Sequence, residues 1–422
     1  MSGASIADAA WLSESGLQKL LAILSQGGEE ARIAGGAVRN ALLGQDVADI
    51  DIATTALPEE TIRRVEAAGF KAIPTGIEHG TVTAIVDGRP VEITTLRADV
   101  VTDGRHATVA FGRDWKADAG RRDFTINALY ATADGTVIDH VGGLADLETR
   151  TIRFIGDAEA RIREDYLRIL RFFRFFARYG SGRPDAEGLK ACARLKDGLD
   201  RLSAERVWSE LKKMLSARDP SRALLWMRQA GVLTKVLPES EKWGIDAIHG
   251  LAAAERDLGW PIDPILRLES IVPPDAVRMG EMAARLRLSN AEADRLKDWA
   301  LASLAKPDTS EAVFARQLYS GKVQGMTDRL RLALAGARAK AIEDSTAMMA
   351  AGGYGRLLKF AEQWQRPVFP VGGEDLKRLG VAAGPAMGVA LKALETAWIE
   401  SGFALSREDL LARQSGGSSA PT

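Results

Sequence analysis

The chain has 422 residues, 46% hydrophobic and 27% charged, a composition that supports sizeable cores in roughly two to four domains. Its 56 basic and 57 acidic residues nearly cancel, which excludes a uniformly basic chain and restricts any nucleic-acid surface to a local patch. The single cysteine, Cys192, excludes an intrachain disulfide framework, and we therefore expect a reducing, cytoplasmic setting. Neither a secretory signal nor an apolar run of membrane-spanning length is found, so no membrane association is expected.

Short β-like runs alternate with helices in the first third of the chain. Residues 17–25 have helical leucine spacing, and helix-like segments follow at 37–43 and 58–68. Apolar runs bounded by glycine-bearing turns predict strands at 32–34, 50–53, 81–86, 91–96 and 136–139. Beyond about residue 157 helical periodicity predominates, and helices are predicted at 161–179, 204–215, 221–229 and 283–304.

This change of pattern predicts an α+β protein, in which a small mixed head precedes an all-helical neck, body and tail. The expected parts are a helical lead-in at 1–28, the head at 29–150, the neck at 151–220, the body and tail at 221–413, and a disordered end at 414–422. The end is expected to be disordered because its sequence, QSGGSSAPT, is poor in apolar residues.

A glycine turn lies between the first predicted strand and the helix that follows it. The segment 33–44, IAGGAVRNALLG, places Gly35 and Gly36 at this turn and Arg39 one helical turn later. Glycines let the backbone approach a ligand closely, and a helix N-terminus offers free N–H groups to a phosphate. Taken alone, the turn predicts a packing contact as readily as a phosphate site.

Two aspartates, Asp49 and Asp51, flank Ile50 on the next predicted strand. Residues two apart on a strand face the same side, so the two carboxylates are expected to project together. Adjacent carboxylates repel each other unless a cation lies between them, and such oxygen ligands suit Mg²⁺ bound to substrate phosphates. A solvated strand face is the alternative. Glu92, on a neighbouring predicted strand, is either a third acid of this site or an exposed strand residue.

A glycine turn, a short helix and then Asp-x-Asp on a strand resemble the polymerase-β-like nucleotidyltransferase head. Five segments in order resemble the class II CCA-adding enzyme and bacterial poly(A) polymerase family, over roughly residues 30–215. They are GGAVRNALLG with DIDI, RRDFTINA at 121–128, DHVGGLADL at 139–147, EDYLRILRFFRF at 164–175 and RLSAERVWSEL at 201–211. The family commonly has aspartate where this chain has Asn40, which removes one charge from a supporting contact.

The resemblance implies roles for these residues. Asp49 and Asp51 are expected to be catalytic and to bind Mg²⁺. The nucleotide-binding residues are expected to be Gly36, Arg39 and Arg122 at the triphosphate, Asp123 at the ribose hydroxyls, and Asp165, Arg168, Arg171 and Arg174 at the base or phosphates. The segment 139–147 is expected to act as a hinge, and the segment 201–211 as a supporting helix.

The fourth segment also has a chemical logic of its own. Asp165 and Arg168 are three apart, so on one helix their side chains can meet. Aspartate accepts from an amino group and arginine donates in a planar fork, so the pair matches the amino group and ring acceptor that cytosine and adenine share. Uracil and guanine present carbonyls there instead. The alternative for the arginines at 168, 171 and 174 is a solvated helix face, and the nearby phenylalanines are expected to be core.

The resemblance implies template-independent addition of CMP and AMP to a tRNA 3′ end, with tRNA, CTP and ATP as partners and no protein partner. Alternatives are a poly(A) polymerase, an enzyme adding only CC or only A, and a catalytically silent RNA-binding protein. Residues 97–113 resemble the flexible loop with which CCA-adding members switch from CTP to ATP. The four histidines are scattered and none precedes an aspartate, so neither a histidine metal site, nor a Ser-His-Asp triad, nor an HD-type phosphohydrolase domain is expected.

Overall fold

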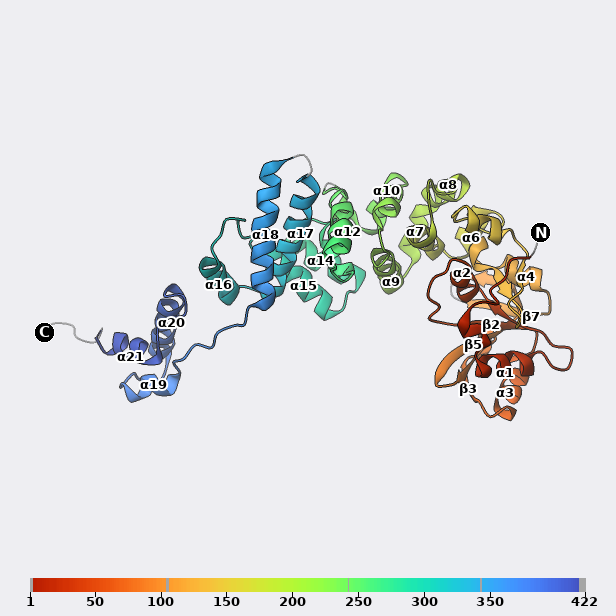
Figure 1. Cartoon of the computed structure of the whole chain (residues 1–422), viewed down its shortest axis with the longest axis horizontal. Helices are drawn as coiled ribbons and strands as arrows, with labels where there is room; N and C mark the ends of the chain where they lie inside the picture. The colour runs from red at the N-terminus through yellow and green to blue at the C-terminus, as the bar shows by residue number, and fades with distance from the viewer. Residues whose placement is uncertain (1–2, 104–105, 242, 342–343, 417–422) are drawn as a thin grey trace. The chain divides into compact units, whose positions relative to one another are not determined.

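The computed structural model describes residues 3–103, 106–241, 243–341 and 344–416, and the chain divides into two compact units, Met1–Pro238 and Glu239–Thr422 (Figure 1). The first unit combines a sheet with helices, whereas the described residues of the second form helices and connecting segments. The division of the first unit at residue 150 into head and neck stays a proposal. Within the described ranges, no helix is long and apolar enough to cross a membrane.

The first unit is built on a seven-stranded mixed sheet. Its strands lie in the spatial order β3 (Lys71–Gly76), β4 (Thr81–Val86), β5 (Arg89–Thr95), β2 (Asp51–Thr54), β1 (Ala31–Ala34), β8 (Leu129–Ala131) and β9 (Val137–Asp139). Only the β2–β5 pairing is parallel in this described sheet, and it sets Asp51 opposite Glu92. Each of the five predicted strands has a counterpart here, whereas β3 and β8 were not predicted.

Helices α1 (Ser15–Leu24), α2 (Gly36–Leu42) and α3 (Pro58–Ala67) accompany the sheet, and α1 and α3 lie side by side (Figure 1). Leucines at helical spacing along α1 are buried, as the sequence predicted: Leu17, Leu20, Leu21 and Leu24. The α3 helix begins at Pro58, whose missing N–H costs nothing at the first helical turn.

A separate two-stranded sheet replaces the flexible loop expected at 97–113. Its strands are β6 (Arg97–Asp103) and β7 (His106–Phe111), antiparallel, with Arg97 opposite Phe111. The expectation of a loop was therefore wrong for residues 97–103 and 106–111. The segment is rich in valine and threonine, whose branched side chains favour an extended backbone. Residues 104–105 lie outside the described residues.

The rest of the first unit is helical. It contains α4 (Trp115–Gly120), η3 (Thr125–Asn127), α5 (Gly143–Glu148), α6 (Ala158–Glu164), α7 (Leu167–Tyr179), α8 (Ala186–Leu195), η4 (Lys196–Arg201), α9 (Ala204–Leu215), α10 (Ser221–Gln229) and α11 (Val232–Val236). The continuous helix expected at 161–179 is wrong at one point: Asp165 is extended, with φ −153 and ψ 107, so α6 ends before it. The α7 side chains expected in the core, Ile169, Phe172, Phe173 and Phe176, are buried.

The segment 139–147, expected to be a hinge, is held by several hydrogen bonds. Asp139 Oδ1 accepts from the backbone N–H groups of Val141 and Gly142 at 3.0 and 2.9 Å. Gly143 packs so closely that an added Cβ would lie 2.3 Å from the Thr125 carbonyl oxygen. Gly143 therefore serves a close approach, whereas Gly142 has open space around it and takes a left-handed φ of 84.

The described helices of the second unit are α12 (Ala247–Leu258), α13 (Pro264–Glu269), α14 (Ala276–Leu286), α15 (Asn290–Leu301), α16 (Glu311–Ser320), α17 (Val323–Lys340), α18 (Ser345–Gln363), α19 (Gly373–Arg378), α20 (Pro385–Glu400) and α21 (Arg407–Gly416). The single helix expected at 283–304 is interrupted where Arg287 takes a left-handed φ of 51 and Ser289 begins α15 with a capping box. Residues 414–416, expected to be disordered, continue α21; residues 417–422 lie outside the described part of the chain.

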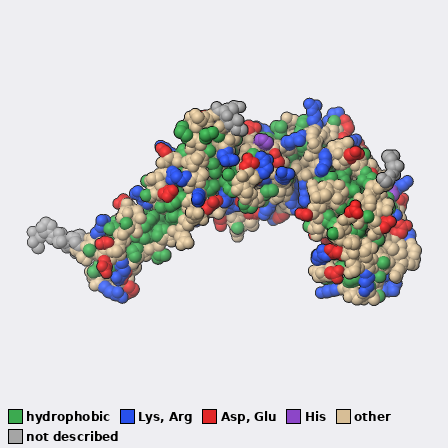
Figure 2. All heavy atoms as spheres, in the orientation of Figure 1, with side chains coloured by type: hydrophobic (Ala, Val, Ile, Leu, Met, Phe, Trp, Pro, Cys, Tyr) green, Lys and Arg blue, Asp and Glu red, His purple; other side chains and the backbone are tan. Residues whose placement is uncertain are grey.

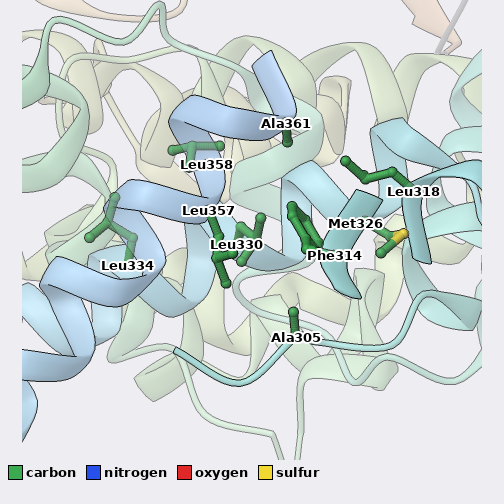
Figure 3. Packing of buried hydrophobic residues seen from close by; sticks show 9 residues of the cluster. All are labelled: Ala305, Phe314, Leu318, Met326, Leu330, Leu334, Leu357, Leu358 and Ala361. Carbon is green, nitrogen blue, oxygen red and sulfur yellow. The ribbon is translucent and has the colours of Figure 1, made fainter. Parts of the chain in front are cut away.

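Apolar side chains from α16, α17 and α18 form one core of the second unit, centred on Phe314, Leu330 and Leu357 (Figure 3). A group of buried ionisable side chains lies elsewhere in this unit. Arg267 and Glu255 are almost fully buried and pair at 2.6 Å, whereas both carboxyl oxygens of buried Glu269 lack a hydrogen-bond partner among the described residues. On the face seen in Figure 2, basic and acidic side chains are interspersed, in keeping with the near-zero net charge.

Candidate active site

A cavity of about 500 Å³ in the first unit collects most of the residues that the sequence singled out. Among its lining residues are Gly36, Arg39, Asp51, Arg122, Asp123, Asp165, Arg168 and Arg171. They come from α2, β2, the segment after α4, the break between α6 and α7, and α7 itself. Asp49 and Arg174 do not line it. The cavity therefore has an acidic edge at β2 and basic walls.

The glycine turn shapes one wall. Gly35 has a left-handed φ of 65, and an added Cβ would lie 3.2 Å from the Asn127 carbonyl oxygen and 3.3 Å from Nη1 of Arg122. Both the backbone conformation and the space therefore require glycine at position 35. Gly36 begins α2 and faces the cavity.

Arg39 lines the cavity but is largely committed to protein contacts. It is 7% exposed, and its guanidinium donates to the side-chain oxygens of Asn127 and Asn40 and to the Tyr179 hydroxyl. It also lies 4.1 Å from the centre of the Tyr179 ring. Burial lowers the pKa of this guanidinium. Arg39 thus joins α2 to α7, and Asn40 accepts from it without adding a negative charge.

The two aspartates lie at the start of β2. Only Asp51 belongs to the strand; the expectation that Asp49 does too was wrong, because β1 ends at Ala34, opposite Asp51, and leaves Asp49 without a partner strand. Although Asp51 is exposed, protein atoms around its carboxyl raise its pKa, and the charges of Glu92 and Asp49 raise it further while Arg122 lowers it. A cation bound between neighbouring carboxylates offsets the electrostatic repulsion between them.

Asp49 and Asp51 suit a divalent metal whose other ligands come from the substrate. Asp49 and Asp51 supply hard oxygen ligands, and substrate phosphates complete the coordination of Mg²⁺ in sites with one or two carboxylates. Within the described ranges, no three histidine, cysteine or carboxylate side chains are arranged to hold a metal by themselves. The fit therefore concerns a metal that arrives with a nucleotide.

The RRD segment supplies the basic wall and one buried acid. Arg122 donates to Asp118, to the Tyr130 hydroxyl and to the Asn127 carbonyl. Asp123 Oδ1 accepts from the Phe124 N–H and from Nδ2 of Asn127, each at 2.9 Å, and Oδ2 accepts from Nε of Arg171 at 2.8 Å. Burial raises the pKa of Asp123, but the Arg171 charge and these hydrogen bonds outweigh it and hold the pKa below its ordinary value.

The expected contact between Asp165 and Arg168 is wrong for this structure. Asp165 Oδ2 accepts from Arg206 of α9 at 2.7 Å and Oδ1 from the Leu167 N–H at 3.0 Å. Arg168 donates instead to Glu164 at 2.5 Å. The reason is the extended backbone at Asp165, which removes the helical spacing that would bring residues 165 and 168 together.

Arg171 and Arg174 of α7 are also paired, so the alternative of a solvated helix face does not hold for them. Arg171 bonds Asp123, and Nε of Arg174 donates to Glu210 of α9 at 2.5 Å. Arg174 lies 4.3 Å from the centre of the Phe175 ring.

Several cavity residues were missed from the sequence, chiefly Arg121, Asn127 and Arg206. Arg121 and Asn127 lie inside the RRDFTINA motif and could have been included with it. Arg206 lies in the segment interpreted as a supporting helix, and its partner is 41 residues earlier in the chain.

Known proteins resemble this chain along most of its length. Residues 31–153 match the Poly A polymerase head domain family, and residues 183–243 match the family described as the probable RNA and SrmB-binding site of polymerase A. The mitochondrial CCA tRNA nucleotidyltransferase 1 of Mus musculus is 35% identical, over 94% of this chain and 89% of its own. The CCA-adding enzyme of Levilactobacillus brevis is 32% identical, over 89% of this chain and 91% of its own.

The fold is shared with solved structures. The Bacillus stearothermophilus CCA-adding enzyme in complex with CTP matches with a TM-score of 0.71 and 28% identity, over 94% of this chain and 95% of that one. The expected α+β fold, with a polymerase-β-like head and a helical remainder, is confirmed. Given the identity and coverage of its relatives, this chain belongs to the family of CCA tRNA nucleotidyltransferases, the CCA-adding enzymes.

Proposed function

We propose that this protein adds CMP and AMP to the 3′ end of tRNA without a nucleic-acid template, using CTP and ATP and releasing pyrophosphate. The observation that carries the proposal is the cavity in which the acidic edge at Asp51 faces arginines from the RRD segment and from α7. An acidic edge suits a metal-bound triphosphate, and arginines suit its phosphates. Relatives that match nearly the whole chain have this activity in their names.

Nucleotidyltransferases of this family generally use a divalent metal, and we propose Mg²⁺ bound through Asp49 and Asp51. When bound, the metal would neutralise charge on the phosphates and favour ionisation of the attacking 3′-hydroxyl. Gly36 and Arg122 would border the triphosphate, with Arg39 fixing the wall between them. Glu92, opposite Asp51 in the sheet, would keep the edge acidic whether or not it touches the metal.

The choice of base is proposed to depend on Asp165 and an arginine beside it. Asp165, Arg168 and Arg206 all line the cavity, and Asp165 bonds Arg206. An aspartate acceptor next to an arginine donor presents the edge that cytosine and adenine match, whichever arginine supplies the donor. Asp123, with Arg171 bound to it, would face the ribose, and Arg174 would support α7 through Glu210.

A labelled-nucleotide assay tests the proposal. Transcripts of tRNA lacking the whole CCA end, the last two nucleotides or the last one are incubated with each NTP singly and then with CTP and ATP. The expected products stop at CCA. Long A tracts would indicate a poly(A) polymerase, and products stopping at CC, or A added only to a CC end, would indicate a partial enzyme. Binding of tRNA without incorporation would indicate a silent RNA-binding protein.

The metal site has its own variants. Asp49→Asn and Asp51→Asn should abolish both CMP and AMP addition in Mg²⁺ while leaving tRNA binding nearly unchanged. Asp46→Asn is the matched control, because Asp46 is an exposed aspartate in the same connecting segment and does not line the cavity. Near-normal turnover of the double variant would remove this pair from consideration.

The cytoplasm is the compartment we propose, on the basis of the single buried cysteine. Some relatives are mitochondrial proteins, so cell fractionation is the test.

A further inference from the structure

A buried carboxylate behind the basic wall has no part in the proposed reaction. Asp118, on α4, is 1% exposed. Its Oδ1 accepts from Nε and Nη2 of Arg121 at 2.8 and 2.6 Å. Its Oδ2 accepts from Nη2 of Arg122 at 3.2 Å and from the Tyr130 hydroxyl at 2.6 Å. One carboxylate therefore holds both arginines that follow α4, and both arginines line the cavity.

Tyr130 completes this arrangement from β8. Its hydroxyl donates to Asp118 and accepts from Nε of Arg122 at 3.2 Å. The residue is fully buried, and its ring meets the Trp115 ring edge-on at 5.2 Å. The hydroxyl is thus held at a fixed position by packing as well as by hydrogen bonds, and it in turn fixes the guanidinium of Arg122.

The sheet relates this group to the acidic edge. Ala34 of β1 lies opposite Tyr130 on one side and opposite Asp51 on the other. Residues that are directly opposite in a sheet point to the same face, so Tyr130 and Asp51 share a face two strands apart.

The N–H groups of Arg122 that make no contact with described residues of the protein indicate which ligand it can bind. The single N–H of Nε is shared by the Tyr130 hydroxyl and Asp118, while Nη1 donates to the Asn127 carbonyl and Nη2 to Asp118. In these described contacts, one N–H of Nη1 and one of Nη2 remain for another acceptor. N–H groups on two nitrogens of one guanidinium can donate to two oxygens of a phosphate.

We propose that Asp118 and Tyr130 are positioning residues, which orient Arg122 so that its fork meets the phosphates of the incoming nucleotide. The inference rests on the proposed function and concerns the triphosphate alone. It therefore implies equal effects on CTP and ATP, because the base takes no part in the contact.

Tyr130→Phe tests the proposal, since it removes one hydroxyl and keeps the ring against Trp115. The expected result is a rise of about tenfold in KM, and in the Kd of nucleotide measured without tRNA, by the same factor for CTP and ATP. The KM for tRNA and the preference for C and A over U and G should not change. Asp118→Asn should give a larger rise in the same constants, because it weakens the hold on both Arg121 and Arg122.

Tyr319→Phe is the matched control. The Tyr319 hydroxyl also donates to a carboxylate at 2.6 Å, that of Glu395 in the second unit, so its loss should leave nucleotide KM unchanged. Melting curves accompany every variant. A Tyr130→Phe protein with wild-type KM and Kd for nucleotides overturns the proposal, as does an equal loss of tRNA and nucleotide binding with a lowered Tm. Failure of the wild type to incorporate CMP or AMP would instead overturn the proposed function.

Discussion

Replacing Asp165 by asparagine should reduce the selectivity for cytosine and adenine while preserving the local backbone conformation. In Asp165→Asn the side-chain oxygen can still accept from the Leu167 N–H, a contact of 3.0 Å that stabilises the start of α7. The other carboxylate oxygen, which accepts from Arg206 at 2.7 Å, becomes an NH₂ group. An NH₂ group cannot accept from Arg206 or from the amino group of cytosine or adenine.

The size of the effect follows from the kind of hydrogen bond that the substitution removes. A hydrogen bond to a charged group contributes about 1.5–3 kcal/mol, so kcat/KM for CTP and ATP should fall roughly ten- to a hundred-fold. UTP and GTP make no matched hydrogen bond to the carboxylate, and their relative use should rise. The assay is single-nucleotide incorporation with each of the four NTPs, beside a melting curve for each protein. Arg168→Ala should lower efficiency for CTP and ATP in the same direction.

Two matched controls separate recognition from stability. Asp200→Asn breaks a carboxylate–lysine pair of 2.6 Å with Lys235, and Arg163→Ala breaks an ion pair of 2.6 Å with Glu159; none of these residues lines the cavity. Both controls should keep the wild-type nucleotide ranking. Variants at 165 and 168 that melt lower yet still prefer C and A over U and G would refute the recognition role.

Three further predictions address other parts of the chain. Gly198→Ala would place a Cβ 1.9 Å from the Tyr166 ring and must displace it, so stability should fall by about 1–3 kcal/mol and base discrimination should weaken, as melting and four-nucleotide assays can show. Burial raises the pKa of Glu269 well above its ordinary value, so the folded protein keeps a proton that the unfolded chain releases. The free energy of unfolding should then decline by up to about 1.4 kcal/mol per pH unit as the pH rises above the ordinary carboxyl range, and Glu269→Gln should abolish this decline. Substituting residues 103–105 should impair AMP addition more than CMP addition, and equal losses would point to a general role in folding or phosphate binding.

The candidate site could be located from the sequence because its main motifs are local. The glycine turn, the Asp-x-Asp pair and the RRD segment each place their chemistry within a few residues of one another. The partners of these residues are not local. Asp123 meets Arg171 from 48 positions away, and Arg39 meets Tyr179 from 140 positions away. No spacing rule reaches that far.

Two errors around helix α7 have the same physical origin. The break at Asp165 has no proline or glycine beside it to signal that the helix stops, so helical periodicity predicted one continuous helix. Tertiary contacts determine where the helix ends, because Asp165 bonds Arg206 and the Tyr166 ring packs against Gly198. The paired state of the α7 arginines was missed for the same reason.

The ring of Phe124, which precedes the proposed boundary at residue 150, packs against three rings that follow it. Its centroid lies 5.0 Å from that of Phe154, 5.2 Å from that of Phe175 and 6.3 Å from that of Phe172. A fragment ending at residue 150 would expose this aromatic cluster and would leave the buried Asp123 carboxylate without Arg171. We therefore expect the part of the chain before residue 150 and helix α7 to unfold together, in a single cooperative transition.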